Sequence, residues 1–211
     1  MKKIVAISFC FMLVVLPSFC RADDKAVGLL SQLSANIAAL DDYRVEFMVE
    51  AENRQTQGSY IVSGQKFRII TPEFEVISDG ESRYEVNHEI LEVIVDAMDT
   101  SEVNILINPV KAFEFAESGF ASSYVGETEV DGRLCDIVEL KPLGEEPTIT
   151  RVKLYLGRDS GLPVRLEYAI DGIDDDVSVS VSSFRNDPDI KSSDFSFDKS
   201  AYKDYEVVDF R

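Results

Sequence analysis

The chain has 211 residues, the length of a single domain, with 39 acidic and 21 basic side chains and a formal net charge of −18. So acidic a protein is repelled by nucleic acid and by anionic lipid headgroups, which argues against a nucleic-acid partner and against lasting membrane attachment.

The first 22 residues have the pattern of a secretory signal peptide. A basic start is followed by an apolar run over residues 4–19, and Ala22 ends a Cys-Arg-Ala triplet with small residues at its first and third positions. We expect cleavage after Ala22, export to the periplasm and one mature domain over residues 23–211. Without the leader the net charge becomes −21, because three basic residues and no acidic one are lost.

Two alternatives for this segment stay open. A membrane anchor is disfavoured because the apolar run is short for a span and Pro17 lies near its end. A lipoprotein anchored through Cys20 is disfavoured because the bulky Phe19 precedes the cysteine, where lipidation signals have a small residue. The mature chain keeps only Cys135, so it can form no intramolecular disulfide, and we expect that cysteine in the core.

Residues 24–40 read as one amphipathic helix. Apolar side chains recur there at helical spacing, and Asp23 and Asp24 suit the positive end of the helix dipole. The expected buried face consists of Val27, Leu30, Leu33, Ile37 and Leu40.

After residue 42 the period of the pattern changes from that of a helix to two, as in half-buried strands. Tight turn signals such as Ser78-Asp79-Gly80-Glu81 separate the apolar runs, so neighbouring strands should pair antiparallel. Eleven strands are predicted, at residues 43–50, 60–62, 66–70, 74–77, 83–86, 90–96, 124–130, 134–140, 150–156, 164–170 and 177–181.

Residues 103–120 interrupt this rhythm. Pro109 suits a helix N-terminus, and the apolar residues after it could form one face of one or two short helices. The fold class is therefore mainly β (α+β). A sheet of about eleven strands must curl, and it can cover its apolar face with these helices or by closing into a barrel. The alternation of apolar and polar residues does not show whether side chains fill the interior or leave it open for a ligand.

The residues offer no catalytic or metal-binding motif. His88 is the single histidine and is expected to be a solvated turn residue, so neither a zinc site nor a Ser-His-Asp triad is indicated. Residues 174–176 are three aspartates without the spacing of an EF-hand, and no phosphate-binding glycine motif occurs. We expect no enzyme, no cofactor and no metal, although paired carboxylates of the glycosidase type would leave no short motif.

Several segments together resemble the LolA-type lipoprotein carriers. The N-terminal helix is followed by a first strand with Tyr43-x-Val45-x-Phe47, and residues 78–87 resemble the family's S-D-G-x-x-x-W-x-Y-N segment. Asn108-Pro109 stands where such carriers have lid helices. Further matches lie at residues 58–62, 66–69, 132–142, 154–156, 194–198 and 207–211.

This resemblance implies a curled, incompletely closed antiparallel β-barrel with an N-terminal helix and short lid helices over an apolar cavity. It implies a periplasmic carrier that receives acylated lipoproteins or lipids from an inner-membrane release complex and delivers them to an outer-membrane acceptor, as a monomer. The family's Arg-Pro, whose arginine latches the lid, is missing at Ser63-Gly64-Gln65, and Trp is absent. The chain thus looks like a divergent member, of a Bacteroidetes-like type.

The apolar faces of the first strands are the expected cavity lining, and the helical insert is the expected lid. The alternative is a lipid-binding sensor or accessory module on the same fold that signals to a protein partner. The predicted cavity residues are Val45, Phe47, Tyr60, Phe67, Ile69 and Val76, and the predicted lid residues are Leu106, Val110 and Phe113.

Overall fold

The structure is a computed structural model that describes residues 23–52, 54–98, 119–144 and 148–211. The expected leader and the expected lid segment, residues 103–120 apart from the last two, lie outside this range. The described elements are α1 (Asp24–Ala38), β1 (Asp42–Ala51), β2 (Arg54–Ser63), β3 (Lys66–Ile70), β4 (Phe74–Ser78), β5 (Ser82–Asn87), β6 (Glu92–Ala97), β7 (Phe120–Val130), β8 (Arg133–Pro142), β9 (Ile149–Gly157), β10 (Pro163–Ile170), β11 (Val177–Asn186), two 3₁₀ turns η1 (Ser192–Phe195) and η2 (Lys199–Tyr202), and β12 (Glu206–Asp209).

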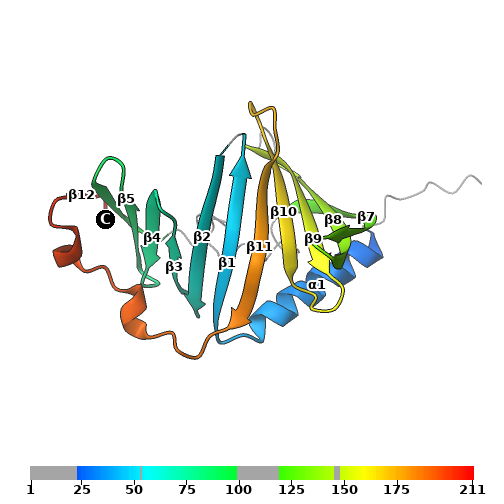
Figure 1. Ribbon diagram of the computed structural model, residues 1–211, viewed down its shortest axis with the longest axis horizontal. Coiled ribbons are helices and arrows are strands. Elements are labelled where there is room, and N and C mark those ends of the chain that lie inside the picture. The colour runs from blue at the N-terminus through cyan, green and yellow to red at the C-terminus, as the bar shows by residue number, and fades with distance from the viewer. Residues whose placement is uncertain (1–22, 53, 99–118, 145–147) are drawn as a thin grey trace, which may run out of the picture.

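All twelve strands form one curled sheet in the order β12-β6-β5-β4-β3-β2-β1-β11-β10-β9-β8-β7 (Figure 1). Every neighbouring pair is antiparallel except β12 and β6, which are parallel. Within the described residues the sheet is not closed, because β7 and β12 are its two edges. The predicted fold class is confirmed, with one strand more than the eleven expected.

The helix α1 lies against one face of the sheet, beside the β7–β10 end (Figure 1). Asp23 caps its first turn by accepting a hydrogen bond from the backbone N–H of Lys25. Leu30 and Leu33 are buried as expected, but Val27 is exposed and the helix ends at Ala38 instead of residue 40. Among the described helices, none has the length and apolar character needed to cross a membrane.

The face of the sheet that α1 covers carries the main core. Its buried members come from α1 and from both halves of the sheet, including Leu33, Val45, Phe67, Leu154 and Leu166. Each strand presents alternate residues to this core, which is why a period of two appears in the sequence. We call this side the inner face.

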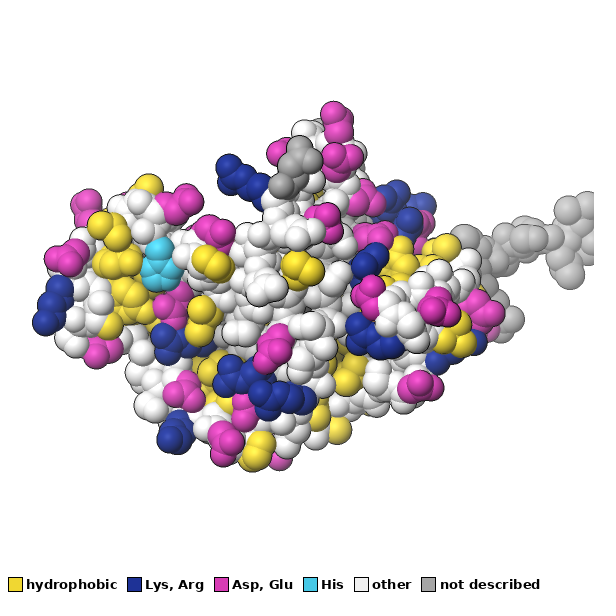
Figure 2. Space-filling model, viewed as in Figure 1, with side chains coloured by type: hydrophobic (Ala, Val, Ile, Leu, Met, Phe, Trp, Pro, Cys, Tyr) yellow, Lys and Arg dark blue, Asp and Glu magenta, His cyan; other side chains and the backbone are white. Residues whose placement is uncertain are grey.

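A second, smaller core lies on the opposite, outer face of β4–β6, where the C-terminal segment crosses the sheet (Figure 1). Residues 75–78 of β4 are all buried, so the strand is covered on both sides. Figure 2 shows hydrophobic side chains gathered around the single histidine, His88, at this end of the molecule. His88 lies in the predicted turn, but it is partly buried instead of solvated, with its Nδ1 2.8 Å from the hydroxyl of Tyr205.

Candidate functional site: the apolar inner face

The six predicted cavity residues lie together on the inner face. Each is at most 5% exposed, and all belong to the one main core cluster. Four of them form a row straight across four strands, because Val45 of β1 pairs with Tyr60 of β2, Tyr60 with Ile69 of β3, and Ile69 with Val76 of β4. That these side chains contact a ligand stays a prediction.

Aromatic rings occupy the middle of this face. The ring of Tyr60 lies 6.3 Å from that of Tyr43, edge to face, and 6.0 Å from that of Phe47. Tyr43 in turn stacks on Phe184 of β11, with centroids 5.3 Å apart. A continuous series of rings therefore crosses from β2 through β1 to β11.

The other half of the inner face was not singled out as lining in the sequence, although its strands were predicted. Its side chains are apolar and at most 6% exposed, and they come from β8–β11. The sequence signal for them was the same alternation of apolar and polar residues, for instance over residues 134–140. The inner-face residues of this half are Val138, Leu140, Val152, Leu154, Leu156, Leu166, Tyr168, Val179 and Val181. The predicted lid residues Leu106, Val110 and Phe113 lie outside the described residues.

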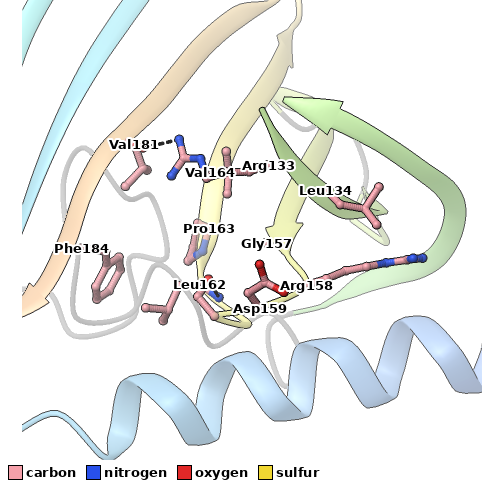
Figure 3. Close-up of a pocket in the computed structure, with 11 residues that line it drawn as sticks. Arg133, Leu134, Gly157, Arg158, Asp159, Leu162, Pro163, Val164, Val181 and Phe184 are labelled. Carbon is pink, nitrogen blue, oxygen red and sulfur yellow. Dashed lines mark hydrogen bonds between the residues drawn. The ribbon is translucent and has the colours of Figure 1, made fainter. Parts of the chain in front are cut away.

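A pocket of about 220 Å³ opens where the sheet splits between β10 and β11 (Figure 3). The β10–β11 ladder ends at the pair Arg165–Ser180, whereas β11 continues to Asn186. The pocket is lined by Arg133, Leu134, Gly157, Arg158, Asp159, Ser160, Leu162, Pro163, Val164, Val181 and Phe184.

Arg133 bridges this split. Beyond Ser180 the β10–β11 ladder stops, and the carbonyl of Val181 instead accepts a 3.3 Å hydrogen bond from the Arg133 guanidinium (Figure 3). Val181 belongs to the main core, and Phe184 and Leu162 pack against it. The pocket therefore adjoins the inner face from the side, and Phe184 connects it to the series of aromatic rings.

A charged cluster fixes the start of α1 to the sheet beside this pocket. The Asp136 carboxylate of β8 accepts hydrogen bonds from Lys25 Nζ (3.2 Å), the Tyr124 hydroxyl (2.9 Å) and Arg158 (2.9 and 3.0 Å). The hydrogen bonds from Arg158 are the largest cause that lowers the Asp136 pKa to about 2, outweighing its burial. Arg158 also pairs with Glu127 of β7. The charges of Lys25, Arg158 and Asp136 are thus paired with one another inside this cluster.

The part of the chain that the structure describes contains no group of three or more side chains suited to hold a metal ion. Cys135 is fully buried with Val130 and Val164, and burial raises the pKa of its thiol, so it acts as a small core residue.

Comparison with solved structures gives the fold a context. A conserved protein of unknown role from Thermus thermophilus superposes with a TM-score of 0.62 at 9% identity, over 88% of this chain and 99% of the other. MucB superposes with a TM-score of 0.53 at 14% identity, over 83% of this chain and 64% of MucB, and MucB has also been solved in complex with MucA(peri). A LolA superfamily protein from Nitrosomonas europaea aligns at 12% identity over 82% and 98% of the two chains, with a TM-score of only 0.42.

The chain shares its fold with the Thermus thermophilus protein and with MucB. No protein-family sequence model matches it, and no curated protein sequence matches it significantly. The predicted resemblance is thus confirmed as one of architecture, at identities that carry no residue roles from one protein to another.

Proposed function

We propose that this protein is a periplasmic carrier that binds the acyl chains of lipoproteins at its inner face and shuttles them to the outer membrane. The observation that supports this most is the unbroken apolar row Val45, Tyr60, Ile69 and Val76 across a curled sheet that has not closed. A sheet with two edges can widen to admit a chain, which a closed barrel with a packed core cannot do.

The energetics of acyl burial suit such a carrier. Each methylene that leaves water contributes roughly 0.8 kcal/mol, so an apolar interior can hold a chain in water without an energy source. The strong negative charge of the protein would then keep the loaded carrier from staying on anionic membranes.

The proposal also includes how the carrier would be exported, loaded and unloaded. The leader would be cleaved after Ala22, and residues 23–211 would act as one monomeric domain without catalytic activity. An inner-membrane release complex would load the carrier, and an outer-membrane acceptor would unload it.

A second candidate is a sensor or accessory module that reads envelope lipids and signals to a protein partner. It is favoured by the likeness to MucB, which is solved in complex with MucA(peri). This chain spans only 64% of the length of MucB.

Native mass spectrometry of the protein purified gently from its own envelope tests the proposal. Adducts of acylated peptides or lipoproteins would support the carrier and identify its cargo. Adducts of phospholipid or glycolipid alone would overturn the lipoprotein assignment in favour of lipid carriage or sensing. A protein without adducts that also ignores added lipid would have a filled core, and the carrier proposal would then fail.

A further inference from the structure

The hydroxyl of Tyr60 is a polar group left alone in the apolar interior. The Tyr60 side chain is 3% exposed, and its oxygen is inaccessible to solvent and forms no hydrogen bond with any described residue. Its cross-strand neighbours are Val45 and Ile69, and the ring of Phe47 lies beside it. The surroundings therefore supply packing for the ring and nothing for the hydroxyl.

Such a hydroxyl is costly to the unliganded protein. Buried polar groups in folded proteins nearly always have a partner, and one without a partner keeps its desolvation penalty. Phenylalanine would fill the same space without that penalty. An unpaired group in a binding site is commonly one that a ligand completes.

The character of the hydroxyl limits what that ligand group can be. Burial raises the pKa of Tyr60 well above its ordinary value, and the nearby Tyr43 and Tyr168 add to this effect. The phenol is thus a neutral hydrogen-bond donor at physiological pH. A carboxylate or phosphate beside it would need a cation to offset its burial, and its described neighbours Val45, Phe47 and Ile69 supply none. A neutral acceptor embedded in hydrocarbon fits instead.

We propose that the Tyr60 hydroxyl donates a hydrogen bond to the carbonyl oxygen of the ester or amide group that links a bound acyl chain to its carrier molecule. This inference rests on the proposed binding of acyl chains and adds which group of the ligand is recognised. The carbonyl would lie over the middle of the row on β1–β4, and the hydrocarbon would extend along the inner face. The site would therefore select acylated molecules over plain alkyl chains.

The test compares two phosphatidylcholines with equal chain lengths, one ester-linked and one ether-linked. The ether lipid lacks only the carbonyl oxygens. Dissociation constants are measured for the parent, for Tyr60→Phe and for Tyr155→Phe. Tyr155 is the matched control, because its hydroxyl donates a 2.8 Å hydrogen bond to Glu167 on the outer face.

The parent should bind the ester lipid about five- to tenfold more tightly than the ether lipid, the effect of one buried hydrogen bond. Tyr60→Phe should lose this preference with unchanged affinity for the ether lipid, and Tyr155→Phe should keep it. Without ligand, Tyr60→Phe should resist urea at least as well as the parent, whereas Tyr155→Phe should unfold at lower urea.

Each opposite result is decisive. If the parent binds both lipids equally, or if Tyr60→Phe keeps the preference for ester, the hydroxyl does not recognise the carbonyl, while the proposed carrier function stands. If unliganded Tyr60→Phe is less stable than the parent, the hydroxyl already has a partner and the inference fails. If the parent binds neither lipid, the inference fails, and the proposed function fails with it when the purified protein also carries no acylated adduct.

Discussion

The ring of Phe47 lies directly over Gly58, its cross-strand partner on the inner face. A Cβ atom placed on Gly58 would be 2.6 Å from Cζ and 2.8 Å from Cε2 of that ring, and 3.0 Å from the carbonyl oxygen of Ile70. No side chain larger than hydrogen fits between the ring and the strand. Gly58 thus sets the depth at which Phe47 sits in the core.

Gly58→Ala should therefore destabilise the protein by about 1–3 kcal/mol, since the ring must leave its position against a rigid backbone. The free energy of unfolding in urea measures this. Gly28→Ala is the control, because Gly28 lies in α1 with no atom within 4 Å of an added Cβ, and there alanine should stabilise by about 0.5–1 kcal/mol. Equal stability of Gly58→Ala and the parent would show that the ring does not rest on Gly58.

The row of inner-face residues could be predicted from the sequence because a half-buried strand repeats with period two. Val45, Ile69 and Val76 each carry that signal locally, and antiparallel pairing then brings them into one row. The role of Gly58 could not be read in this way, because it depends on cross-strand register.

The Asp136 cluster should make stability depend on pH in acid. The pKa of this carboxyl is about 2 in the folded protein, below its ordinary value of 3.8. A group with a lowered folded pKa stabilises the protein fully above its unfolded pKa, and this contribution is lost as the pH falls through the folded pKa. The window therefore extends from about pH 4 down to about pH 2.

Asp136→Asn should cost about 1.5–3 kcal/mol at neutral pH, the scale of hydrogen bonds to charged groups, and this deficit should shrink as the pH falls from about 4 to 2. Urea unfolding across that pH range measures it. Asp174→Asn removes the same charge from an exposed turn and should leave the profile unchanged. A deficit for Asp136→Asn that stays constant down to pH 2 would contradict the assigned pKa.

The pocket and its bridge by Arg133 were beyond sequence reasoning for a specific reason. The register of β10 shifts between Pro163 and Arg165, and the ladder with β11 stops at Ser180. The alternation of apolar and polar residues predicts the strands, but it does not predict the residue at which the hydrogen-bonded ladder between two strands ends. Arg133 itself looks like any charged residue after the turn at Asp131-Gly132.

Arg133→Ala should loosen the sheet at this split. The Val181 carbonyl would lose its hydrogen bond, so amide exchange in residues 181–186 should become several-fold faster, while global stability falls by only about 0.5–1.5 kcal/mol. Hydrogen–deuterium exchange followed by mass spectrometry measures the local effect. Arg54→Ala, at the exposed start of β2, is the control. Unchanged exchange in Arg133→Ala would mean that the guanidinium does not hold the split together.

No strand was predicted beyond β11, after residue 181, so β12 in the C-terminal segment was missed. The short sequence Glu206-Val207-Val208-Asp209 has only two apolar residues, and its pairing with β6 is parallel and distant in sequence. Besides this backbone pairing, the C-terminal segment packs through aromatic side chains, one of which stacks on Tyr84 on the outer face of β5. Local patterns do not contain such long-range stacking.

Phe197 is the centre of that attachment. Its ring stacks on Tyr84 of β5 at 4.7 Å and on Tyr202 of η2 at 5.2 Å, with an interplanar angle of 11° in both pairs. Removing the ring takes one partner from each neighbour and opens a void over the small outer core. Phe197→Ala should lower the free energy of unfolding by about 2–4 kcal/mol, the range for large aromatic truncations at a partly buried site.

Limited proteolysis gives a second measurement for the same variant, because a loosened tail is cut before the domain unfolds. Cleavage within residues 187–211 should be faster in Phe197→Ala than in the parent. Phe210→Ala is the matched control, since that ring is 68% exposed and should change neither the urea midpoint nor the cleavage rate. If the two variants behave alike, the tail is held mainly by the backbone hydrogen bonds of β12. The stack would then add little to the attachment.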